Sequence, residues 1–445
     1  MSNGQGAFSH RRRHQCLPRA ALCLALLAAL PQVAGAFDVD YEVGLGIKRS
    51  NNINLSQDDP ISDTVITPQM RFEADLDGPR VQLAARGDAQ YLHYTSNTFD
   101  DELRGTFAGK LNVAVLPDRM DFVFQDYLSR QPVDELAPLT PTNEQQANVF
   151  VAGPSLHARF SPTTRGQLDL RYTNSYAEDN KTFNGDRFDV AARLVHELSA
   201  TRTASANLEA TRAEFDGAGA SSDYDAYDGY FGYKMQRKSI DASIDLGYSR
   251  LDPRNRNGDA SSALVRATLD WRISPRGLLS TTVRHQLTDA TQALITPTLD
   301  FDRRSFSDFR YMDVSVRPNP YRERLLRVRY QFTGERLTAN LVPYYRRIRY
   351  LDGLVEDEDR NGLLLDVAYR LRPRLSLSLL AAREDRKFVD IARTDEDLGI
   401  SVGLVNRFTR HWTGRVDLQR RERDSTALGR SYGANAAIVT LSYRR

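Results

Sequence analysis

Hydrophobic and polar residues alternate with a period of two residues along most of this chain. In residues 165–176, Leu168 and Leu170 fall on one side of the alternation. Asp169 and Arg171 fall on the other side, so the polar row is charged. A period of two predicts a β-strand with one apolar and one polar face. The same strand-length pattern returns roughly every twenty residues until the chain ends, which predicts about twenty strands.

The first 36 residues lack this pattern and have the features of a secretory signal peptide. Arginines up to Arg19 form a basic start, and Ala20–Leu30 is apolar. Val33–Ala36 then ends in an Ala-x-Ala cleavage site. The apolar stretch is shorter than the ~20 residues that span a bilayer, which disfavours a membrane anchor helix. Cys23 lacks the small preceding residue of lipoprotein processing sites, which disfavours a lipid anchor.

Removing residues 1–36 leaves a chain with nearly balanced charge and no cysteine. Four arginines and no acids are lost, so Lys plus Arg fall from 60 to 56 against 58 Asp plus Glu, a net charge of −2. This balance argues against a nucleic-acid partner, which would require a basic surface. Cys16 and Cys23 both lie in the removed segment, so the mature chain is not a disulfide scaffold.

Apolar runs are short throughout the mature chain. It contains no run of 18 apolar residues, which excludes a bundle of membrane-spanning helices. Mean hydropathy is −0.51, lower than the core segments of a soluble protein of this length would give. A transmembrane barrel explains both facts, because its strands turn one face to lipid and the other to a wet interior. We therefore predict a signal peptide over 1–36 and, over 37–445, a single all-β domain, an antiparallel up-and-down barrel of the Gram-negative outer membrane.

Short turns and long connections alternate along the chain. The short turns are Asp77–Pro79, Pro117–Asp118, Ser161–Thr163, Ala200–Arg202, Arg237–Lys238, Ser274–Arg276, Gly334–Glu335, Pro373–Arg374 and Arg410–His411. The long connections are rich in Asp, Asn, Gly and Ser and cover 49–62, 95–102, 129–147, 177–187, 216–226, 251–261, 289–322, 351–361, 388–397 and 423–431. Together they join twenty strands. Because bacterial barrels have short periplasmic turns, both termini are expected in the periplasm.

One stretch is ambiguous, since Phe309–Val316 could form a strand of its own. Counting it would move the short turn at Gly334 to the outer side and break the alternation. We therefore assign 289–322 as one long outer loop, with room for its own hairpin. Counts of eighteen or twenty-two strands are the nearest alternatives, because element boundaries are the weakest part of such predictions.

The polar rows of the strands are expected to line the barrel interior. In the strand starting at Ile240, Ile244 and Leu246 face lipid while Asp241 and Asp245 face the lumen. An inverted register would place arginines at mid-bilayer, at a cost of ~2–4 kcal/mol each, so the register is strongly fixed. The lumen-lining candidates are Arg86, Asp88, Asp169, Arg171, Asp241, Asp245, Arg266, Asp270, Arg327, Arg329, Asp366, Arg415 and Asp417.

Some of these candidates place both signs of charge inside the barrel. They are Arg86 with Asp88, Asp169 with Arg171, Arg266 with Asp270 and Arg415 with Asp417. Cross-strand ladders of such pairs would stiffen the barrel wall. They would also give a polar, hydrogen-bonding surface suited to hydrated or sugar-like solutes. The structural role is the simpler of the two interpretations.

No catalytic, metal or cofactor site is predicted. The histidines of the mature chain have no partner at metal-ligand spacing, and they are His93, His157, His196, His285 and His411. His93 and His285 stand in predicted strands and serines are common, so a lipid-modifying enzyme with a Ser-His pair is kept as a minor alternative. The chain has no Gly-x-Ser-x-Gly motif.

Acidic outer loops and a proline-containing outer loop are interpreted separately. Asp58–Asp59 and Glu356–Asp359 are acidic, and because they lack the spacing of a calcium loop, solvated acidic loops are the simpler interpretation. The third outer loop, 129–147, contains Pro132, Pro138 and Pro141. By analogy with porins whose third loop narrows the lumen, we hypothesise that this loop folds inward.

Several short motifs are similar to those of a known family. They are Ser50–Leu55 after the first strand, Ile66–Pro68, Tyr91–Tyr94, Arg329–Gly334 and Tyr344–Arg347. With these motifs the chain resembles, over essentially 37–445, the outer-membrane β-barrels associated with PEP-CTERM and exopolysaccharide gene clusters, a β-barrel porin group. The resemblance implies a barrel tied to polysaccharide or surface-protein export. It supplies no catalytic or binding residues.

The C-terminus departs from a common barrel pattern. Many outer-membrane barrels end on an aromatic residue that the assembly machinery reads. This chain ends Tyr443-Arg444-Arg445, with its aromatic residue two positions early. Either the last strand runs past the periplasmic interface, or its insertion signal is weaker.

These features lead to one leading function and two alternatives. The leading function is passage of polar solutes or exopolysaccharide through a porin-like lumen. A non-conducting structural or assembly scaffold of a surface-export system is the main alternative, and a lipid-modifying enzyme is the lesser one. Expected partners are outer-membrane lipid and lipopolysaccharide, together with polysaccharide and export-machinery proteins. No cofactor and no nucleic acid are expected.

Overall fold

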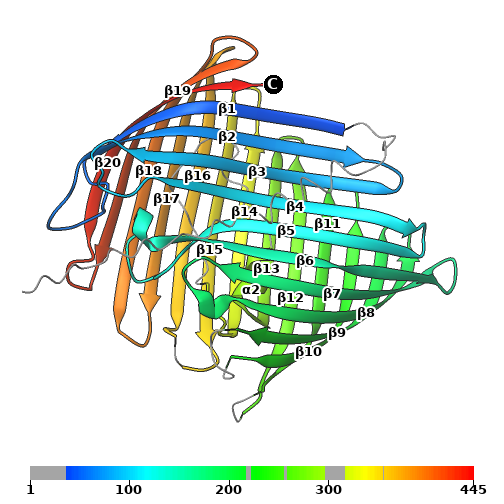
Figure 1. Ribbon diagram of the computed structural model, residues 1–445. Coiled ribbons are helices and arrows are strands. Elements are labelled where there is room, and N and C mark those ends of the chain that lie inside the picture. The colour runs from blue at the N-terminus through cyan, green and yellow to red at the C-terminus, as the bar shows by residue number, and fades with distance from the viewer. Residues whose placement is uncertain (1–36, 217–221, 255–257, 296–315, 354) are drawn as a thin grey trace, which may run out of the picture.

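A computed structural model describes residues 37–216, 222–254, 258–295, 316–353 and 355–445. It contains one antiparallel sheet of twenty strands, which β1–β20 pairing closes into a barrel (Figure 1). The strands are β1 (Phe37–Ser50), β2 (Asp63–Asp77), β3 (Val81–Tyr94), β4 (Glu102–Leu116), β5 (Met120–Pro132), β6 (Glu144–Arg159), β7 (Thr164–Ala177), β8 (Gly185–Ser199), β9 (Arg202–Phe215), β10 (Tyr224–Gln236), β11 (Ile240–Pro253), β12 (Ala260–Ser274), β13 (Gly277–Thr288), β14 (Tyr321–Thr333), β15 (Leu337–Tyr350), β16 (Glu358–Arg372), β17 (Leu375–Phe388), β18 (Arg393–Arg407), β19 (Trp412–Ser425) and β20 (Tyr432–Arg444). The predicted fold class and strand count are confirmed. The expected signal peptide, 1–36, lies outside the described residues.

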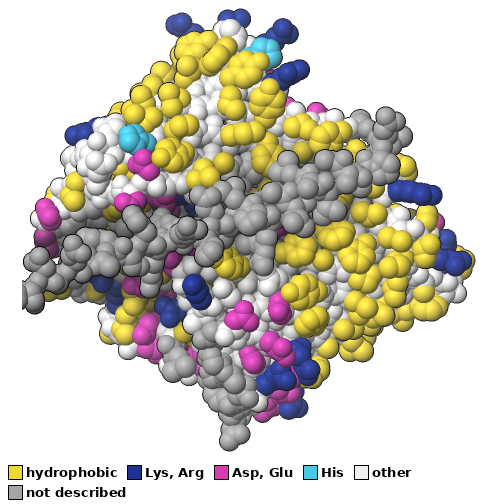
Figure 2. Space-filling model, in the orientation of Figure 1, with side chains coloured by type: hydrophobic (Ala, Val, Ile, Leu, Met, Phe, Trp, Pro, Cys, Tyr) yellow, Lys and Arg dark blue, Asp and Glu magenta, His cyan; other side chains and the backbone are white. Residues whose placement is uncertain are grey.

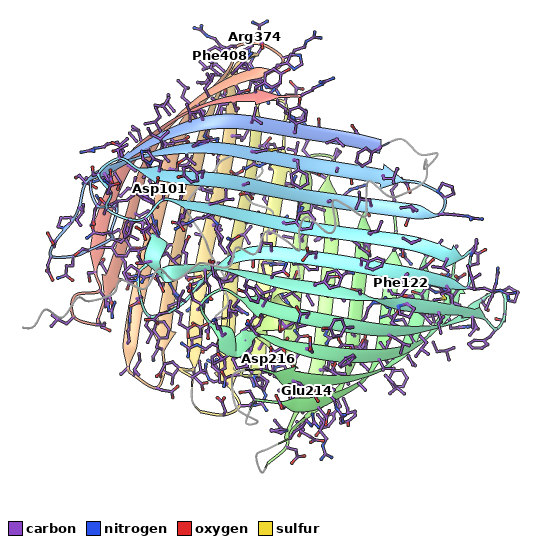
Figure 3. All side chains as sticks on the ribbon, in the orientation of Figure 1. Asp101, Phe122, Glu214, Asp216, Arg374 and Phe408 are labelled. Carbon is purple, nitrogen blue, oxygen red and sulfur yellow. The ribbon has the colours of Figure 1, made fainter. Side chains whose placement is uncertain are left out.

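Short and long connections alternate around the barrel as the sequence predicts. Their short helices are η1 (Pro141–Asn143), η2 (Lys181–Phe183) and α2 (Ala290–Ile295). Two neighbouring short turns are joined by a hydrogen bond, in which Arg374 Nη1 donates to the Phe408 carbonyl at 3.3 Å. Figure 3 shows these two residues together at one end of the barrel, away from Asp101 and Asp216 at the long-loop end.

The segment between β13 and β14 is one connection, as assigned from the turn alternation. Its described part contains α2 and residues 316–320. The stretch 309–315, where the sequence left room for a strand, lies outside the described residues.

The strands extend further into the long-loop end than the sequence predicts. They are 12 to 16 residues long, whereas a tilted strand needs only about 9–11 residues to cross a bilayer. β16 begins at Glu358, so the prediction that Glu356–Asp359 lies wholly in a loop is wrong. Ion pairs explain the difference, because Glu358 bonds Arg360 at 2.7 Å and Asp359 bonds Arg347 at 3.0 Å within the strands.

The motif Ser50–Leu55, the first of those that resemble the porin group, extends the seam between β1 and β20. Above the last strand pair, the Asn51 amide donates to the Asn435 carbonyl at 3.1 Å. In return, the Asn435 amide donates to Asn51 Oδ1 at 2.7 Å. The Asn52 side chain donates to the Gly433 carbonyl at 3.0 Å. These bonds extend the closure of the barrel into its first loop.

The two faces of the sheet differ as the alternation predicts. Ile244, Leu246 and Tyr248 of β11 are all more than a third exposed on the outward face. In Figure 2 hydrophobic side chains cover much of the visible wall, and charged side chains gather toward its edges. In the described parts of the chain, no helix has the length and apolar character needed to cross a membrane.

The two faces should respond differently to the same charge. Ile244→Arg places a guanidinium on the outward face near the centre of β11, so we expect a loss of about 2–4 kcal/mol in the free energy of unfolding in lipid vesicles. The neighbouring inward substitution Ser243→Arg should change it by less than about 0.5 kcal/mol. Denaturant titration followed by tryptophan fluorescence measures both values. Equal losses would contradict the assignment of the two faces.

Candidate functional site

Every lumen-lining candidate lies on one continuous face of the sheet. The register is consistent around the ring: Asp245 faces Arg266 and Asp241 faces Asp270 across β11 and β12. Arg171 faces Asp189 across β7 and β8. This is the face opposite to the exposed apolar rows, and it also carries the buried residues against which α2 packs. We call it the inward face.

Two of the expected charge pairs form as direct contacts. Arg171 Nη2 lies 3.1 Å from Asp169 Oδ1, and Arg415 Nε lies 2.6 Å from Asp417 Oδ2. Each pair joins residues two positions apart on one strand, where side chains share a face. Asp169 also accepts a hydrogen bond from Ser155 Oγ on β6 at 2.5 Å, so the pair is tied to the next strand.

The other two pairs are arranged differently. Arg266 pairs with Asp228 on β10 at 3.5 Å, while Asp270 accepts a bond from Ser280. Arg266 and Asp270 are four residues apart, roughly 13 Å along one strand, so they share the inward face without contacting each other. Asp88 accepts from Thr106 Oγ1, and the register places Arg86 and Asp88 opposite Glu73 and Arg71 of β2.

The remaining candidates occupy inward positions on β14 and β16. Arg327 faces Thr282 and Arg329 faces Ser280 across β13 and β14. Asp366 accepts a hydrogen bond from Asn340 Nδ2 at 3.3 Å. Their contribution to a passage through the barrel stays a prediction.

Sequence reasoning missed a buried ionic network at the long-loop end of β14–β19. Its ion pairs are Glu323–Arg346 at 2.9 Å, Glu358–Arg360 at 2.7 Å, Glu384–Arg386 at 3.2 Å, Asp397–Arg423 at 2.7 Å and Arg393–Asp395 at 2.7 Å. The sequence does contain a signal for this network, because three of the pairs have the same two-residue spacing as Asp169 and Arg171. Because the predicted strands were too short, six of these residues were assigned to long connections, namely Glu358, Arg360, Arg393, Asp395, Asp397 and Arg423.

Loop 133–143, the third outer loop, reaches the opposite wall of the barrel. Asn143 holds the loop together, with its Nδ2 donating to the carbonyls of Asp134 and Pro138 and its Oδ1 accepting from the Asp134 amide. Glu135 is 5% exposed, and the charges around it belong to Glu358 and Arg360 of β16 and to Arg386 of β17. The loop leaves β5, so these neighbours place it across the lumen.

Glu135 is a carboxyl group buried next to another carboxyl group. Burial, together with the Glu358 charge, raises the pKa of Glu135 to about 7. Its Oε2 has no hydrogen-bond partner among the described residues. The docked loop therefore favours the protonated form of this side chain.

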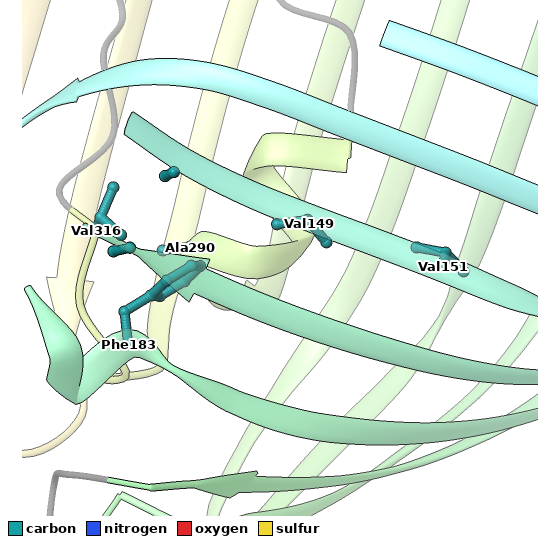
Figure 4. Close-up of a cluster of buried hydrophobic side chains, with 7 residues drawn as sticks. Val149, Val151, Phe183, Ala290 and Val316 are labelled. Atoms are coloured by element: carbon teal, nitrogen blue, oxygen red, sulfur yellow. The ribbon is translucent and has the colours of Figure 1, made fainter. Parts of the chain in front are cut away.

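Helix α2 also lies inside the barrel, against the inward face of β6. Ala290 and Val316 belong to one buried cluster with Val149 and Val151 of β6 and Phe183 of η2 (Figure 4). The cluster is apolar on a face that is otherwise charged. The segment that follows β13 therefore covers part of the wall formed by β6 and β7.

Asp289 anchors α2 at its first turn. Its side chain is 1% exposed and accepts a bond from Tyr224 Oη at 2.6 Å. Arg187 Nη1 lies 3.3 Å from both Asp289 oxygens. The same carboxylate accepts from the Gln292 amide at 2.9 Å, which caps the helix. One side chain thus joins α2 to β8 and β10.

A groove with both polar and apolar lining remains between loop 133–143 and the wall from β19 through β1 to β4. Leu139 and Pro141 of the loop form one side. The opposite side includes Lys48, Gln69, Arg104, Arg421 and Asn435. Amides and guanidinium groups of this kind donate hydrogen bonds to hydroxyl and carboxylate oxygens.

The histidines do not form a metal site in the described residues, where no group of three His, Cys, Asp or Glu side chains could hold an ion. His93 Nδ1 lies 2.7 Å from Asp101 Oδ2. His285 Nε2 lies 3.1 Å from Ser262 Oγ, a contact that the sequence could not specify. Ser262 is only 8% exposed, which limits access to it as a nucleophile.

Comparisons with known proteins support the barrel. Residues 359–445, nearly all of β16 to β20, match a family described as "Putative beta-barrel porin 2". The chain shares 8% identity and a TM-score of 0.50 with the siderophore receptor PirA from Acinetobacter baumannii, over 94% of this chain and 81% of that one. The FrpB iron transporter from Neisseria meningitidis (F3-3 variant) has 8% identity and a TM-score of 0.45, over 95% and 83%.

Acinetobacter baumannii OccAB4 has 10% identity and a TM-score of 0.36, over 93% of this chain and 99% of that one. A comparison with curated proteins gives no match. At these identities the likeness concerns the fold. The chain is an outer-membrane β-barrel whose last strands resemble those of a β-barrel porin family.

Proposed function

We propose that the barrel carries polar solutes across the outer membrane through a lumen narrowed by loop 133–143 and α2. The groove between loop 133–143 and the β19–β4 wall, with polar side chains such as Lys48 and Asn435 in its lining, is the observation that carries this proposal. The match of residues 359–445 to a porin family supports it. We also propose that both termini lie in the periplasm and the long loops outside, as in other bacterial barrels.

The solute class follows from the lining of the groove. Lys48, Gln90 and Asn435 supply hydrogen-bond donors, while Arg104 and Glu144 of the same lining bond each other at 2.5 Å. Hydroxyl-rich solutes, such as segments of polysaccharide, fit such a surface better than apolar solutes. The resemblance to barrels of exopolysaccharide gene clusters supports the same class, with export-machinery proteins as partners.

A non-conducting scaffold is the second candidate, and the segments that fold into the lumen favour it. Loop 133–143 and α2 both occupy the interior, and buried ion pairs hold the wall around them. A barrel of this kind would anchor an export assembly and pass nothing. The two candidates differ in whether ions can cross the closed barrel.

Planar-bilayer recording of the purified barrel tests the proposal. Stable conductance steps are expected from the wild type, and deletion of residues 132–142 should raise the step size because it removes the inward loop. Absence of steps at every voltage, in both proteins, would support the scaffold instead.

Loss of the α2 anchor should also open the lumen. Asp289→Ala leaves Arg187 without this carboxylate and removes the helix cap, so we expect larger and noisier conductance steps. Asp241→Ala is a matched control, since it removes an inward carboxylate that accepts a hydrogen bond from Gln236 Nε2 near a short turn. Equal conductance of the two variants would contradict a gating role for α2.

The position of loop 133–143 should depend on pH. The pKa of Glu135 is higher in the docked loop than the 4.5 of the free carboxyl, so docking is strongest below pH 4.5 and weakens as the pH rises to about 7. Conductance should therefore increase across this range. Glu135→Gln removes the titrating proton and should give conductance that stays flat. A wild-type profile matching that of the variant would exclude Glu135 as the sensor.

A further inference from the structure

The outward faces of β14 and β15 change abruptly from apolar side chains to arginines. The change occurs between one outward residue pair and the next. On the lipid-facing side, Leu326 pairs in register with Tyr345. The next outward pair is Arg324 with Arg347, and the one after it is Arg322 with Arg349. The residues between them, including Glu323 and Arg346, point inward and are buried. We call Arg322, Arg324, Arg347 and Arg349 the outer arginine cluster.

The register places like charges directly opposite each other twice in this cluster. Such pairs are destabilising on a sheet. The inward face fixes the register, because a shift by one residue would turn Glu323 and Arg346 toward lipid. The strands therefore cannot relieve the repulsion by sliding, and it must be balanced by nearby anions.

Carboxylates of the described residues balance only part of this charge. Asp359 lies 3.0 Å from Arg347 Nε and 2.8 Å from Arg349 Nη2, and Asp357 lies 3.4 Å from Arg349 Nε. Two carboxylates thus serve four guanidinium groups, and Lys387 also faces Asp359 in register. Positive charge remains in excess at Arg322 and Arg324.

The two arginines of β14 have unused donors. Arg324 is exposed, and its guanidinium makes no hydrogen bond or ion pair with the described residues. Arg322 donates from Nη2 to the Ser261 carbonyl at 3.2 Å, while its Nε is buried with no partner among the described residues. His285 faces Arg324 in register across β13 and β14 and brings no carboxylate to the cluster.

We propose that the outer arginine cluster binds the phosphate of a phosphorylated lipid in the outer leaflet. Guanidinium groups bind phosphate oxygens through paired, charge-assisted hydrogen bonds. The cluster stands directly above Leu326 and Tyr345, so acyl chains packed on these side chains bring a headgroup to the height of the arginines. The long loops lie at the same end of the strands, the end that faces outward in bacterial barrels. The phosphorylated glycolipid of that leaflet is the occupant.

Native mass spectrometry of the full barrel in detergent, titrated with lipid A, tests this site. The double variant Arg324→Gln, Arg347→Gln should bind lipid A at least tenfold more weakly than the wild type. The matched control is Arg383→Gln, Arg420→Gln, because these outward arginines pair with their own acids Asp385, Glu396 and Glu422. The control should bind as the wild type does.

Further measurements distinguish lipid phosphate from free phosphate and test whether the variants fold. Lipid A without its phosphates should bind the wild type as weakly as phosphorylated lipid A binds the cluster variant. Inorganic phosphate that displaced lipid A at equal concentration would instead indicate a site for the free ion and overturn the lipid assignment. Heat-dependent gel mobility reports folding, and Arg324→Lys, Arg347→Lys keeps the charge if the glutamine variant fails to fold. Equal lipid A affinity of the cluster and control variants would overturn the proposal.

Discussion

Backbone hydrogen bonding across the β1–β20 seam is the interaction on which the whole barrel depends. Lipid offers no partner for a free strand edge, so a sheet can cross a membrane only if it closes on itself. Here Glu42–Ser50 of β1 pairs with Ala436–Arg444 of β20, and Tyr41 and Arg445 exchange two further backbone bonds. Pairing therefore continues through the basic end of the chain, two residues past Tyr443. Tyr443 itself packs against Trp412 and His411.

Closure fixes the register, and the register decides where each charge lies. Because opposite residues share a face, one charged row forces its neighbours inward all around the ring. The inward charges then serve two purposes, one near the centre of the strands and one at the long-loop end. Near the centre of the strands they tie the wall together, as Asp169, Arg171 and Ser155 do. At the long-loop end, Glu358 and Asp289 meet segments that fold into the lumen.

Arginine has different surroundings on the two faces of β14 and β15. Inside, Arg346 is buried and bonded to Glu323. Outside, Arg324 and Arg347 stand in register at the edge of the lipid-facing rows with too few carboxylates around them. Buried charge is tolerated only when it is paired, so the inward face of the barrel had to supply its own anions. The outward cluster can take its anion from the membrane.

The sequence by itself determined the barrel, the count of twenty strands and the inward or outward direction of side chains within the strands it predicted, because a period of two residues and an alternation of turns are local signals. It also showed the pairs at two-residue spacing, such as Arg415 with Asp417. Only the tertiary structure decided that Arg266 pairs with Asp228, that Glu135 reaches β16 and that Asp289 joins α2 to β8 and β10. Those contacts join residues far apart in the chain, and the pairing of the strands together with the inward folding of the loops brings them together.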